Sequence, residues 1–470
     1  MSTDALRIPV ERDLREILER IRVETHVPGL GVAVSVGGRQ VTAYSGQPAL
    51  DSEHAFSEQS RFEMSCLMKL FSSFAVLELS DEGVLDIEQP VPEYLPEIPL
   101  CGLNRKDLRV HHLMDHTSGY RGLDVSNSQV RWNYSWDRFL QHCGTQARHF
   151  TPGSVFNYEH SEHVVLGEIV RRICGRPVMA IVHERILEPL HIHLSCVNAD
   201  RKRVKPYVAQ HTYAPARASF TPMSLPAFGP FWACSLPDAT LTLQETLSVG
   251  EAVLAAWRSQ GKQGIFSATT LAALRKPGPP LPAQVVSGLR SEEMPTSFGM
   301  GFGHYRNGLL GHNGSMFGQT CTLRIDPLQD IAIAVGVNAW VPYARDCAVS
   351  RTLALITGSK KAAEESPPAV MDRVPFKLGQ MINGFSLDDI AGGYVGSYFG
   401  EVHVSRDGDA IHFDLGAEGP RRARVSAVAD AFGHYTLDSS MPVAVGFFND
   451  PADRDRPALM MGVHAYKKVS

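Results

Sequence analysis

The stretch RFEMSCLMKLFSSFAVLELSDEG, from Arg61 to Gly83, carries the densest structural information in the chain. From Cys66 to Leu79 it is apolar on nearly all sides, which predicts a buried helix, and the glycine that follows is a typical helix stop. Cys66 and Lys69 interrupt the first turn of this helix. Because they are three residues apart, their side chains lie on one face, about a turn from each other.

This pair has two interpretations. A helix N-terminus and a neighbouring ammonium both stabilise thiolate over thiol, and a buried lysine can give up its proton and act as a base. Cys66 and Lys69 would then be a nucleophile and its base. Alternatively, Cys66 is a small core residue and Lys69 extends to the surface. The pair alone does not decide between the two.

The composition is that of an ordinary soluble protein. The chain has 470 residues, of which 44% are hydrophobic and 20% charged, enough for more than one structural unit. A net charge of -5 lacks the basic footprint of a nucleic-acid or membrane-surface binder, so neither partner is expected. The N-terminal segment is charged and amphipathic, and no apolar run reaches the length of a membrane span. We therefore expect a cytoplasmic protein.

Two β-hairpins are predicted, one near each end of the larger unit. Pro28 to Gly46 holds two runs rich in valine and alanine joined by Gly37-Gly38. Thr320 to Ile325 and Ile331 to Val337 form the second hairpin. We expect both hairpins to join one antiparallel sheet, with the intervening residues packed as helices and loops.

A change of composition marks the end of this unit. The text GSKKAAEESPPAV, starting at Gly358, is charged and contains prolines, as exposed linkers do. Beyond it, apolar and polar residues alternate around a turn signal at Asp407-Gly408, which predicts a small all-β unit. We predict a large unit over 1–360, a linker over 361–375 and a C-terminal β unit over 376–470.

Several segments, in order, resemble the class C beta-lactamase, DD-peptidase and esterase group of the serine beta-lactamase-like, penicillin-binding-protein-like superfamily. In that group Ser-x-x-Lys opens the central helix, and here Cys66 stands in place of the serine. The matching segments are Phe62, Cys66-Leu67-Met68-Lys69, Glu82-Gly83-Val84-Leu85-Asp86, Pro90 to Pro96 and Leu113 to Gly119. The resemblance covers Val27 to Val337. It implies an α+β fold in which helices flank an antiparallel sheet beside an all-helical region, and Tyr394 to Tyr398 resembles the small β-barrel appendages of some members.

The resemblance also implies roles for individual residues. The group's Tyr-x-Asn motif matches a segment in which Tyr158 is present and His160 replaces the asparagine. Its third motif, Lys-Thr-Gly or His-x-Gly, is similar to Gly311-His312-Asn313-Gly314-Ser315. The catalytic residues would then be Cys66, Lys69 and Tyr158, the oxyanion hole would be the N–H groups of Cys66 and Ser315, and the substrate-binding residues would be His160, His312, Asn313 and Gly314.

Other reactive residue types are interpreted as structural. Ser65 is out of register with Lys69, and Ser259-Gln260-Gly261-Lys262 lies in a polar loop. The eight cysteines show no paired spacing. A catalytic metal needs three protein ligands in a fixed geometry, so neither a metal nor another cofactor is expected from the histidine clusters. Those clusters are His111-His112, His160-x-x-His163 and His191-x-His193.

A cysteine nucleophile would form a thioester intermediate, which reacts readily with amines and thiols. The leading hypothesis is acyl transfer or acyl hydrolysis on a small ester, thioester or amide in a biosynthetic pathway, with a carrier-protein-bound or coenzyme-A-bound acyl group as a suitable donor. Because His160 and His312 replace the asparagine and lysine that hold a beta-lactam, efficient beta-lactam hydrolysis is not expected. Two alternatives stay open: a degenerate pseudoenzyme that binds a ligand or partner, and an esterase that uses a different serine.

Overall fold

The computed structural model describes most of the chain. The described residues are 6–50, 52–100, 104–120, 123, 134–145, 150–196, 208–214, 219–223, 230–232, 239–281, 295–305, 307–316, 318–359, 374–375, 387–396, 401–407, 410–415, 423–429, 435–437, 445–450, 453–461 and 464–469.

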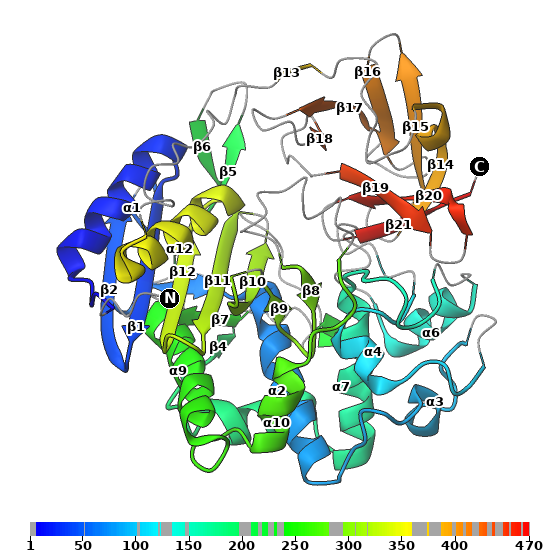
Figure 1. Ribbon diagram of the computed structural model, residues 1–470, viewed down its shortest axis with the longest axis horizontal. Coiled ribbons are helices and arrows are strands. Elements are labelled where there is room, and N and C mark those ends of the chain that lie inside the picture. Colours follow the sequence, from blue (N-terminus) through cyan, green and yellow to red (C-terminus); the bar gives the residue numbers. More distant parts are fainter. Residues whose placement is uncertain are drawn as a thin grey trace.

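A seven-stranded antiparallel sheet, in the order β2-β1-β12-β11-β10-β9-β8, forms the centre of the larger part (Figure 1). Its strands are β1 (Gly29–Val36), β2 (Arg39–Gly46), β8 (Ser297–Phe298), β9 (Gly303–His304), β10 (Leu310–Met316), β11 (Gln319–Asp326) and β12 (Ile331–Val337). The two predicted hairpins are confirmed and lie side by side, since β1 pairs with β12 from Leu30 opposite Val337 onward. β1, β11 and β12 are buried along their whole length, because helices cover both faces of the sheet.

Two helices from opposite ends of this unit cover one face of the sheet. They are α1 (Glu11–Thr25) and α12 (Pro342–Thr357), which contact each other and the strands beneath them (Figure 1). Leu14, Leu18 and Ile21 of α1 join a buried cluster with alternate residues of β1 and β12. This cluster joins an early helix and a late helix of the unit, and it stabilises the side of the sheet formed by β2, β1 and β12.

The other face is covered by three helices, α2 (Met68–Asp81), α9 (Leu243–Ser259) and α10 (Ala268–Arg275). An all-helical region lies beyond α2, as the resemblance implied. It contains α3 (Val91–Tyr94), α4 (Val110–Met114), α6 (Trp136–Thr145), α7 (His160–Cys174), α8 (Val178–Val182) and a π-helical turn (His183–Leu187).

Smaller elements connect these layers. A three-stranded sheet joins β3 (Arg61–Glu63), β7 (Ala239–Thr242) and β4 (Ser195–Cys196), and a separate hairpin joins β5 (Gln210–Ala214) to β6 (Ser219–Met223). Short 3₁₀ turns are η1 (Ser65–Leu67) and η4 (Pro230–Trp232). Because β3 leads directly into η1, the small sheet fixes where the chain enters α2.

The start of the central helix differs from the sequence expectation. The predicted first helical turn at Cys66 is a 3₁₀ turn, and α2 itself begins at Met68. The backbone of Ser65 has a φ of +46°, in the left-handed region, and such a residue does not continue into a regular α-helix. The glycine stop is confirmed, since Gly83 has a φ of +72°. Gly175 ends α7 with a φ of +67° in the same way.

The C-terminal part forms a second antiparallel sheet, which agrees with the expected all-β unit. Its order is β13-β17-β16-β15-β14-β21-β20-β19, with β18 paired to β17. The elements are β13 (Val374–Pro375), α13 (Leu387–Ile390), β14 (Gly392–Gly396), β15 (Glu401–Asp407), β16 (Ala410–Leu415), β17 (Ala423–Ala429), β18 (Tyr435–Leu437), β19 (Val445–Asp450), β20 (Asp453–Met461) and β21 (His464–Lys468).

The α+β fold with a C-terminal β-sheet is thus confirmed, whereas the predicted boundaries remain predictions. Residues 361–373 of the predicted linker lie outside the described residues, and Val374–Pro375 already pair with β17. Tyr394 is buried on β14 and donates a hydrogen bond to the Ile390 carbonyl at 2.8 Å. Within the part of the chain that is described, no helix has both the length and the apolar character to cross a membrane.

The packing of α2 against α10 and the sheet yields a stability prediction. Phe74 is fully buried, and its ring centroid lies 4.5 Å from that of Phe266 and 5.8 Å from that of Phe302. Phe74→Ala should lower the free energy of unfolding by about 3–5 kcal/mol, because it leaves a cavity in a dense core. Urea denaturation followed by tryptophan fluorescence measures this loss. Leu328→Ala is the control, since Leu328 is 84% exposed and its removal should change little.

Candidate active site

The turn that carries Cys66 is strained and tightly held. Ser65, with its left-handed backbone, is only 1% exposed, and its hydroxyl donates a hydrogen bond to the Ser315 carbonyl at 2.9 Å. A non-glycine residue in this conformation costs about 1–3 kcal/mol and persists only where its surroundings impose it. The Cys66 side chain that follows is half-buried, with its Sγ 3.7 Å from the Ser65 hydroxyl oxygen. The turn therefore presents one cysteine sulfur at a fixed place beside β10.

β10 approaches this turn so closely that only glycine fits at one position. A Cβ on Gly314 would lie 2.1 Å from the Met64 carbonyl oxygen and 2.5 Å from the Cys321 sulfur. β9 pairs with only Leu310 and Gly311 of β10. Among the described strands, none pairs with the later residues of β10 on that side, and this free edge of β10 faces η1.

The N–H group of Ser315 points toward the same edge. Its carbonyl leaves the strand there to meet the Ser65 hydroxyl, and in an antiparallel strand the N–H and C=O of one residue leave on the same side. The predicted oxyanion role of the Cys66 and Ser315 N–H groups requires this orientation. The role itself remains a prediction.

Tyr158 lies beside the cysteine. Burial raises the pKa of the Tyr158 phenol well above its usual value, and negative charge at Cys66 acts in the same direction. The phenol therefore keeps its proton. Tyr158, Phe156, Leu281 and Phe298 form a small apolar cluster against which Cys66 packs.

Lys69 does not reach the surface. Its side chain is completely buried, so the interpretation of this residue as an extended surface lysine is wrong. The Lys69 Nζ lies 4.9 Å from the centre of the Tyr158 ring and 2.8 Å from Nδ1 of His160. The structure thus brings Lys69, Tyr158 and His160 together, and Tyr158 joins them to Cys66.

Two matched hydrogen bonds link α2 to the first turn of α7. Lys69 contacts His160, and three residues later on both helices the hydroxyl of Ser72 lies 2.8 Å from Nδ1 of His163. Ser72 donates its own proton to the Lys69 carbonyl at 2.9 Å, so it accepts from His163. The motif His160-x-x-His163 therefore joins two helices. Ser72 was not among the sequence candidates, and the cluster His160-x-x-His163 was interpreted as structural. Two polar residues three apart in the apolar first half of α2 are a visible signal of such a contact.

Four histidines surround Lys69, and all are held neutral near pH 7. Burial, assisted by the positive charge of Lys69, holds the pKa values of His116, His160 and His163 well below the usual range. The same two causes lower the pKa of His312 to about 3. For His116, the charge of His163 is a larger contribution than that of Lys69. Within the described residues, no group of three histidine, cysteine, aspartate or glutamate side chains could hold a metal ion.

A buried carboxyl group supports this cluster from behind. Glu162 contacts Nδ1 of His116, a fully buried residue whose φ is +58°, and also accepts a hydrogen bond from the Ser118 backbone at 3.3 Å. Burial raises the pKa of Glu162 well above its usual value. Sequence reasoning included His116 in the matching segment Leu113 to Gly119 but missed Glu162, which is a buried charged residue in the first turn of α7.

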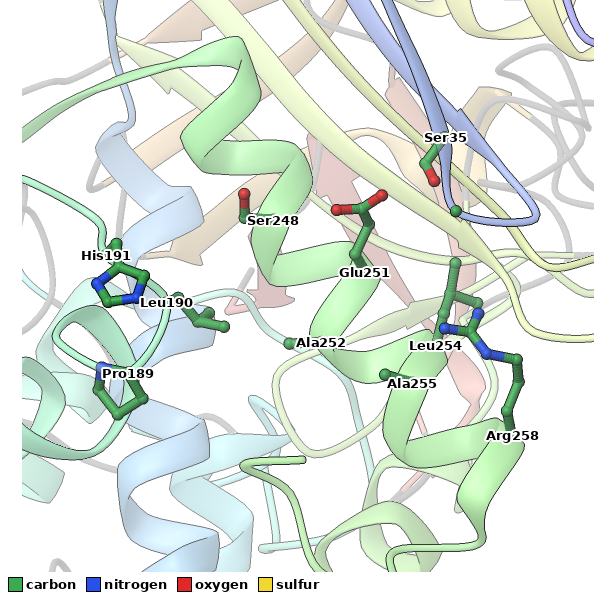
Figure 2. A pocket seen from close by; sticks show the side chains of 11 residues that line it. Ser35, Pro189, Leu190, His191, Ser248, Glu251, Ala252, Leu254, Ala255 and Arg258 are labelled. Carbon is green, nitrogen blue, oxygen red and sulfur yellow. The ribbon is translucent and has the colours of Figure 1, made fainter. Parts of the chain in front are cut away.

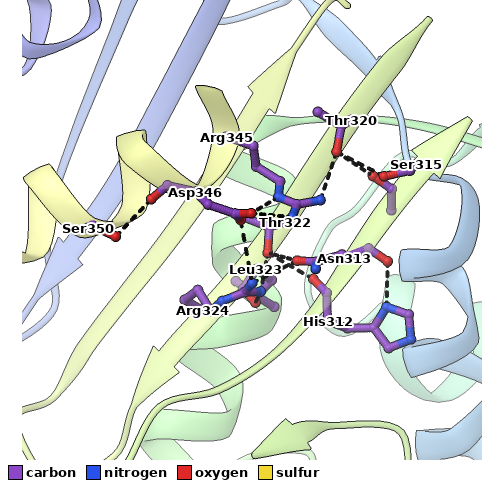
Figure 3. A network of polar contacts seen from close by, with 11 residues as sticks. His312, Asn313, Ser315, Thr320, Thr322, Leu323, Arg324, Arg345, Asp346 and Ser350 are labelled. Carbon is purple, nitrogen blue, oxygen red and sulfur yellow. Dashed lines mark hydrogen bonds and ion pairs between the residues drawn. The ribbon is translucent and has the colours of Figure 1, made fainter. Parts of the chain in front are cut away.

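Behind β10, a polar network fixes the strand that would bind substrate (Figure 3). Arg345 of α12 pairs with Asp346 and donates to the Thr320 hydroxyl at 2.9 Å, and that hydroxyl lies 3.0 Å from the hydroxyl of Ser315.

His312 and Asn313, which are adjacent on β10, have different surroundings. The side-chain oxygen of Asn313 accepts from Thr322 and Arg324, both at 2.8 Å, and therefore belongs to the network. His312 extends away from Arg345 and donates from Nδ1 to the Asn313 carbonyl at 2.7 Å (Figure 3). The predicted substrate contacts of His312, Asn313 and Gly314 remain predictions.

Two other features are separate from this site. The literal Ser-x-x-Lys at Ser259 ends α9, where the serine hydroxyl bonds the Ala256 and Gln263 carbonyls, which confirms its structural interpretation. An open groove of about 440 Å³ runs along α9 (Figure 2). None of the predicted site residues lines it. Its lining residues are Ser35, Gly38, Pro189, Leu190, His191, Ser248, Glu251, Ala252, Leu254, Ala255 and Arg258.

The neutral histidines predict a loss of stability in acid. Their pKa values are lower in the folded state, so the unfolded chain takes up protons first as the pH falls below about 6.5, and each such group then favours unfolding. Glu162 acts in the opposite direction, so the test compares variants. His163→Asn should reduce the slope of the unfolding free energy by about 1.4 kcal/mol per pH unit between roughly pH 6 and pH 5. Urea denaturation at several pH values measures it; an unchanged slope would contradict the assignment, and exposed His183→Gln is the control.

Comparison with known proteins agrees with this geometry. A family model described as Beta-lactamase matches residues 11–357. Penicillin-binding protein 4 of Amycolatopsis lactamdurans is 25% identical over 336 residues, which are 70% of this chain and 85% of the relative. The crystal structure of SurE has a TM-score of 0.71 at 17% identity and covers 98% of this chain and 99% of its own. D-amino acid amidase from Ochrobactrum anthropi SV3, complexed with L-phenylalanine, has a TM-score of 0.61 at 17% identity, over 74% of this chain and 99% of its own.

The two structural similarities concern the fold alone, whereas the family model spans the turn that carries Cys66, the Tyr158 segment and β10. The chain therefore belongs to the beta-lactamase family, within a superfamily of acyl hydrolases and acyltransferases that includes penicillin-binding proteins and esterases.

Proposed function

We propose that this enzyme transfers or hydrolyses acyl groups through a thioester formed on Cys66. The observation that carries the proposal is the packing of Cys66 against the Tyr158 cluster, beside a completely buried Lys69. In a serine enzyme of this fold class a hydroxyl would need a strong base. A thiol ionises far more readily, so the lysine and the phenol have only to hold and deliver one proton.

In the proposed cycle, one proton leaves Lys69 when the enzyme is acylated and returns to Lys69 when the acyl group is released. The Cys66 thiolate attacks the carbonyl carbon of the acyl donor, and the negative charge that develops on the carbonyl oxygen meets the N–H groups of Cys66 and Ser315. The leaving group departs with a proton delivered from Lys69 through the Tyr158 hydroxyl. Water or another acceptor then attacks the thioester, and its proton returns to Lys69 while the sulfur leaves.

The proposed substrates are small acyl compounds. Ochrobactrum anthropi D-amino acid amidase has been crystallised with L-phenylalanine, and SurE with D-Leu, so related folds accept small amino-acid-like molecules. An enzyme thioester is close in energy to a thioester donor, which makes a carrier-bound or coenzyme-A-bound acyl group a suitable donor for transfer. The aromatic and aliphatic side chains around Cys66 favour an apolar acyl group.

The first test is the covalent adduct itself. Incubation with a p-nitrophenyl ester, or with an acyl thioester of N-acetylcysteamine, should add the mass of one acyl group to the protein, and peptide mapping should place it on Cys66. Cys66→Ala should abolish the adduct. Cys66→Ser should keep the fold and change the rate, because an ester replaces the thioester.

Cys174→Ala is the matched control, since Cys174 is also a half-buried free cysteine but lies at the end of α7. This variant should acylate like the wild type. Turnover that persists after Cys66 is blocked by iodoacetamide, or in Cys66→Ala, would mean that a different residue is the nucleophile. A wild-type protein that binds these esters without an adduct would instead favour a pseudoenzyme.

Tyr158→Phe tests the proton path. The ring and its packing beside Cys66 are retained and only the hydroxyl is lost, so the melting temperature should change little. The acylation rate should fall about 10²-fold, the usual size of a general acid–base contribution. Stopped-flow release of p-nitrophenolate measures this rate. Acylation at the wild-type rate would remove Tyr158 from the mechanism.

A further inference from the structure

His160 has a contact pattern that an amide at this position would not share. Its Nδ1 lies 2.8 Å from the Lys69 Nζ, so one ring nitrogen is engaged by the proposed base. The other ring nitrogen, Nε2, has no hydrogen-bond partner among the residues that the structure describes. The His160 side chain is also only partly buried, whereas His116, His163 and His312 are buried and their Nε2 atoms are enclosed. His160 therefore connects the buried amine to the open side of the site.

The protonation state of Lys69 decides which nitrogen of His160 carries the proton. An ammonium has only donors, so it requires a lone pair on Nδ1 and places the imidazole proton on Nε2. A neutral amine can accept, which allows the proton on Nδ1 and leaves the lone pair on Nε2. The accessible nitrogen is thus a donor when Lys69 is charged and an acceptor when Lys69 is neutral.

We propose that His160 relays protons between Lys69 and the acyl acceptor, and that it serves mainly the second half of the reaction. This inference rests on the proposed Cys66 thioester. After acylation Lys69 has given its proton to the leaving group, so it is neutral and Nε2 of His160 is a base. The accessible position of Nε2 is where an incoming acceptor can meet it.

The proton balance of this step is closed. The acceptor transfers its proton to Nε2 as its oxygen, nitrogen or sulfur forms a bond to the thioester carbon. In the same event Nδ1 passes its proton to the Lys69 amine, which restores the ammonium. The carbon–sulfur bond then breaks and returns Cys66 as a thiolate. No oxidant, reductant or metal takes part.

The other charged and titratable groups near His160 are compatible with this role. Tyr158 lies with its ring centroid 5.6 Å away, and Lys69 is the charge that acts on His160 most directly. His163 on the same helix is engaged by Ser72, and His116 and His312 are held neutral by burial and neighbouring positive charge. An asparagine here could still accept from Lys69 through its side-chain oxygen, but an amide cannot exchange protons between its two ends near neutral pH.

The test separates acylation from deacylation in His160→Asn. With p-nitrophenyl butyrate as the probe, the burst of p-nitrophenolate reports acylation and the steady state reports deacylation. The variant should acylate within about threefold of the wild type and deacylate about 10²-fold more slowly, so that the Cys66 butyryl adduct accumulates in intact-mass spectra. Deacylation rates in mixtures of H2O and D2O should depend on the deuterium fraction with curvature in the wild type, because two protons move together, and linearly in the variant.

His163→Asn is the matched control, because it removes a buried imidazole from the same helix without touching the Lys69 amine. It should leave the ratio of acylation to deacylation unchanged. The relay is wrong if His160→Asn deacylates at the wild-type rate, or if it slows both steps by the same factor. If the wild type forms a Cys66 adduct and either of these results is found, the relay is wrong but the proposed function stands. If the wild type forms no adduct, the proposed function is wrong as well.

Discussion

The hydrogen bond from the Ser65 hydroxyl to the Ser315 carbonyl is the contact on which the rest of the site depends. It joins the turn before α2 to an edge strand whose residues are about 250 positions later in the chain. The contact forms only because Gly314 lets β10 lie against the Met64 carbonyl and because Ser65 accepts a left-handed backbone. These local costs are offset by the buried sheet and by the network of α12, which hold both partners in place.

Two residues depart from the motifs that this chain resembles. Cys66 stands where the resemblance leads us to expect serine, and His160 stands where it leads us to expect asparagine. The structure shows that the second change is made next to the buried lysine and not at the surface of the cleft. In the proposed mechanism, a more acidic nucleophile would reduce the demand on the base during acylation, and the attack of an acceptor on the thioester would be the slower step. The proposed proton exchange between His160 and Lys69 would act on that second step.

Much of the fold could be predicted from local patterns, and the failures have identifiable physical causes. Apolar runs predicted both hairpins of the main sheet, because β1, β11 and β12 are buried along their whole length. The turn of the first hairpin uses Gly37 and Gly38, both at positive φ. The start of α2 was misplaced at Cys66 because the conformation of Ser65 is imposed by β10, which no local pattern reports.

In the candidate site, too, local motifs predicted some residues, while contacts between distant segments were missed. Motif order placed Cys66, Lys69, Tyr158 and His160 in one site, and the structure brings these side chains together, while their roles stay predictions. The partners that need three-dimensional contact between helices were missed, namely Ser72 with His163 and Glu162 with His116.

The paired contacts between α2 and α7 have a mechanical consequence. Both helices place their polar residues three positions apart, so the two hydrogen bonds form in one alignment only. A slip of one residue, about 1.5 Å along the axis, would move Lys69 away from His160 and Ser72 away from His163, and both bonds would break together. The two bonds together therefore oppose sliding of α2 against α7. After a small thermal displacement of either helix, they return the Lys69 amine to the same position beside His160.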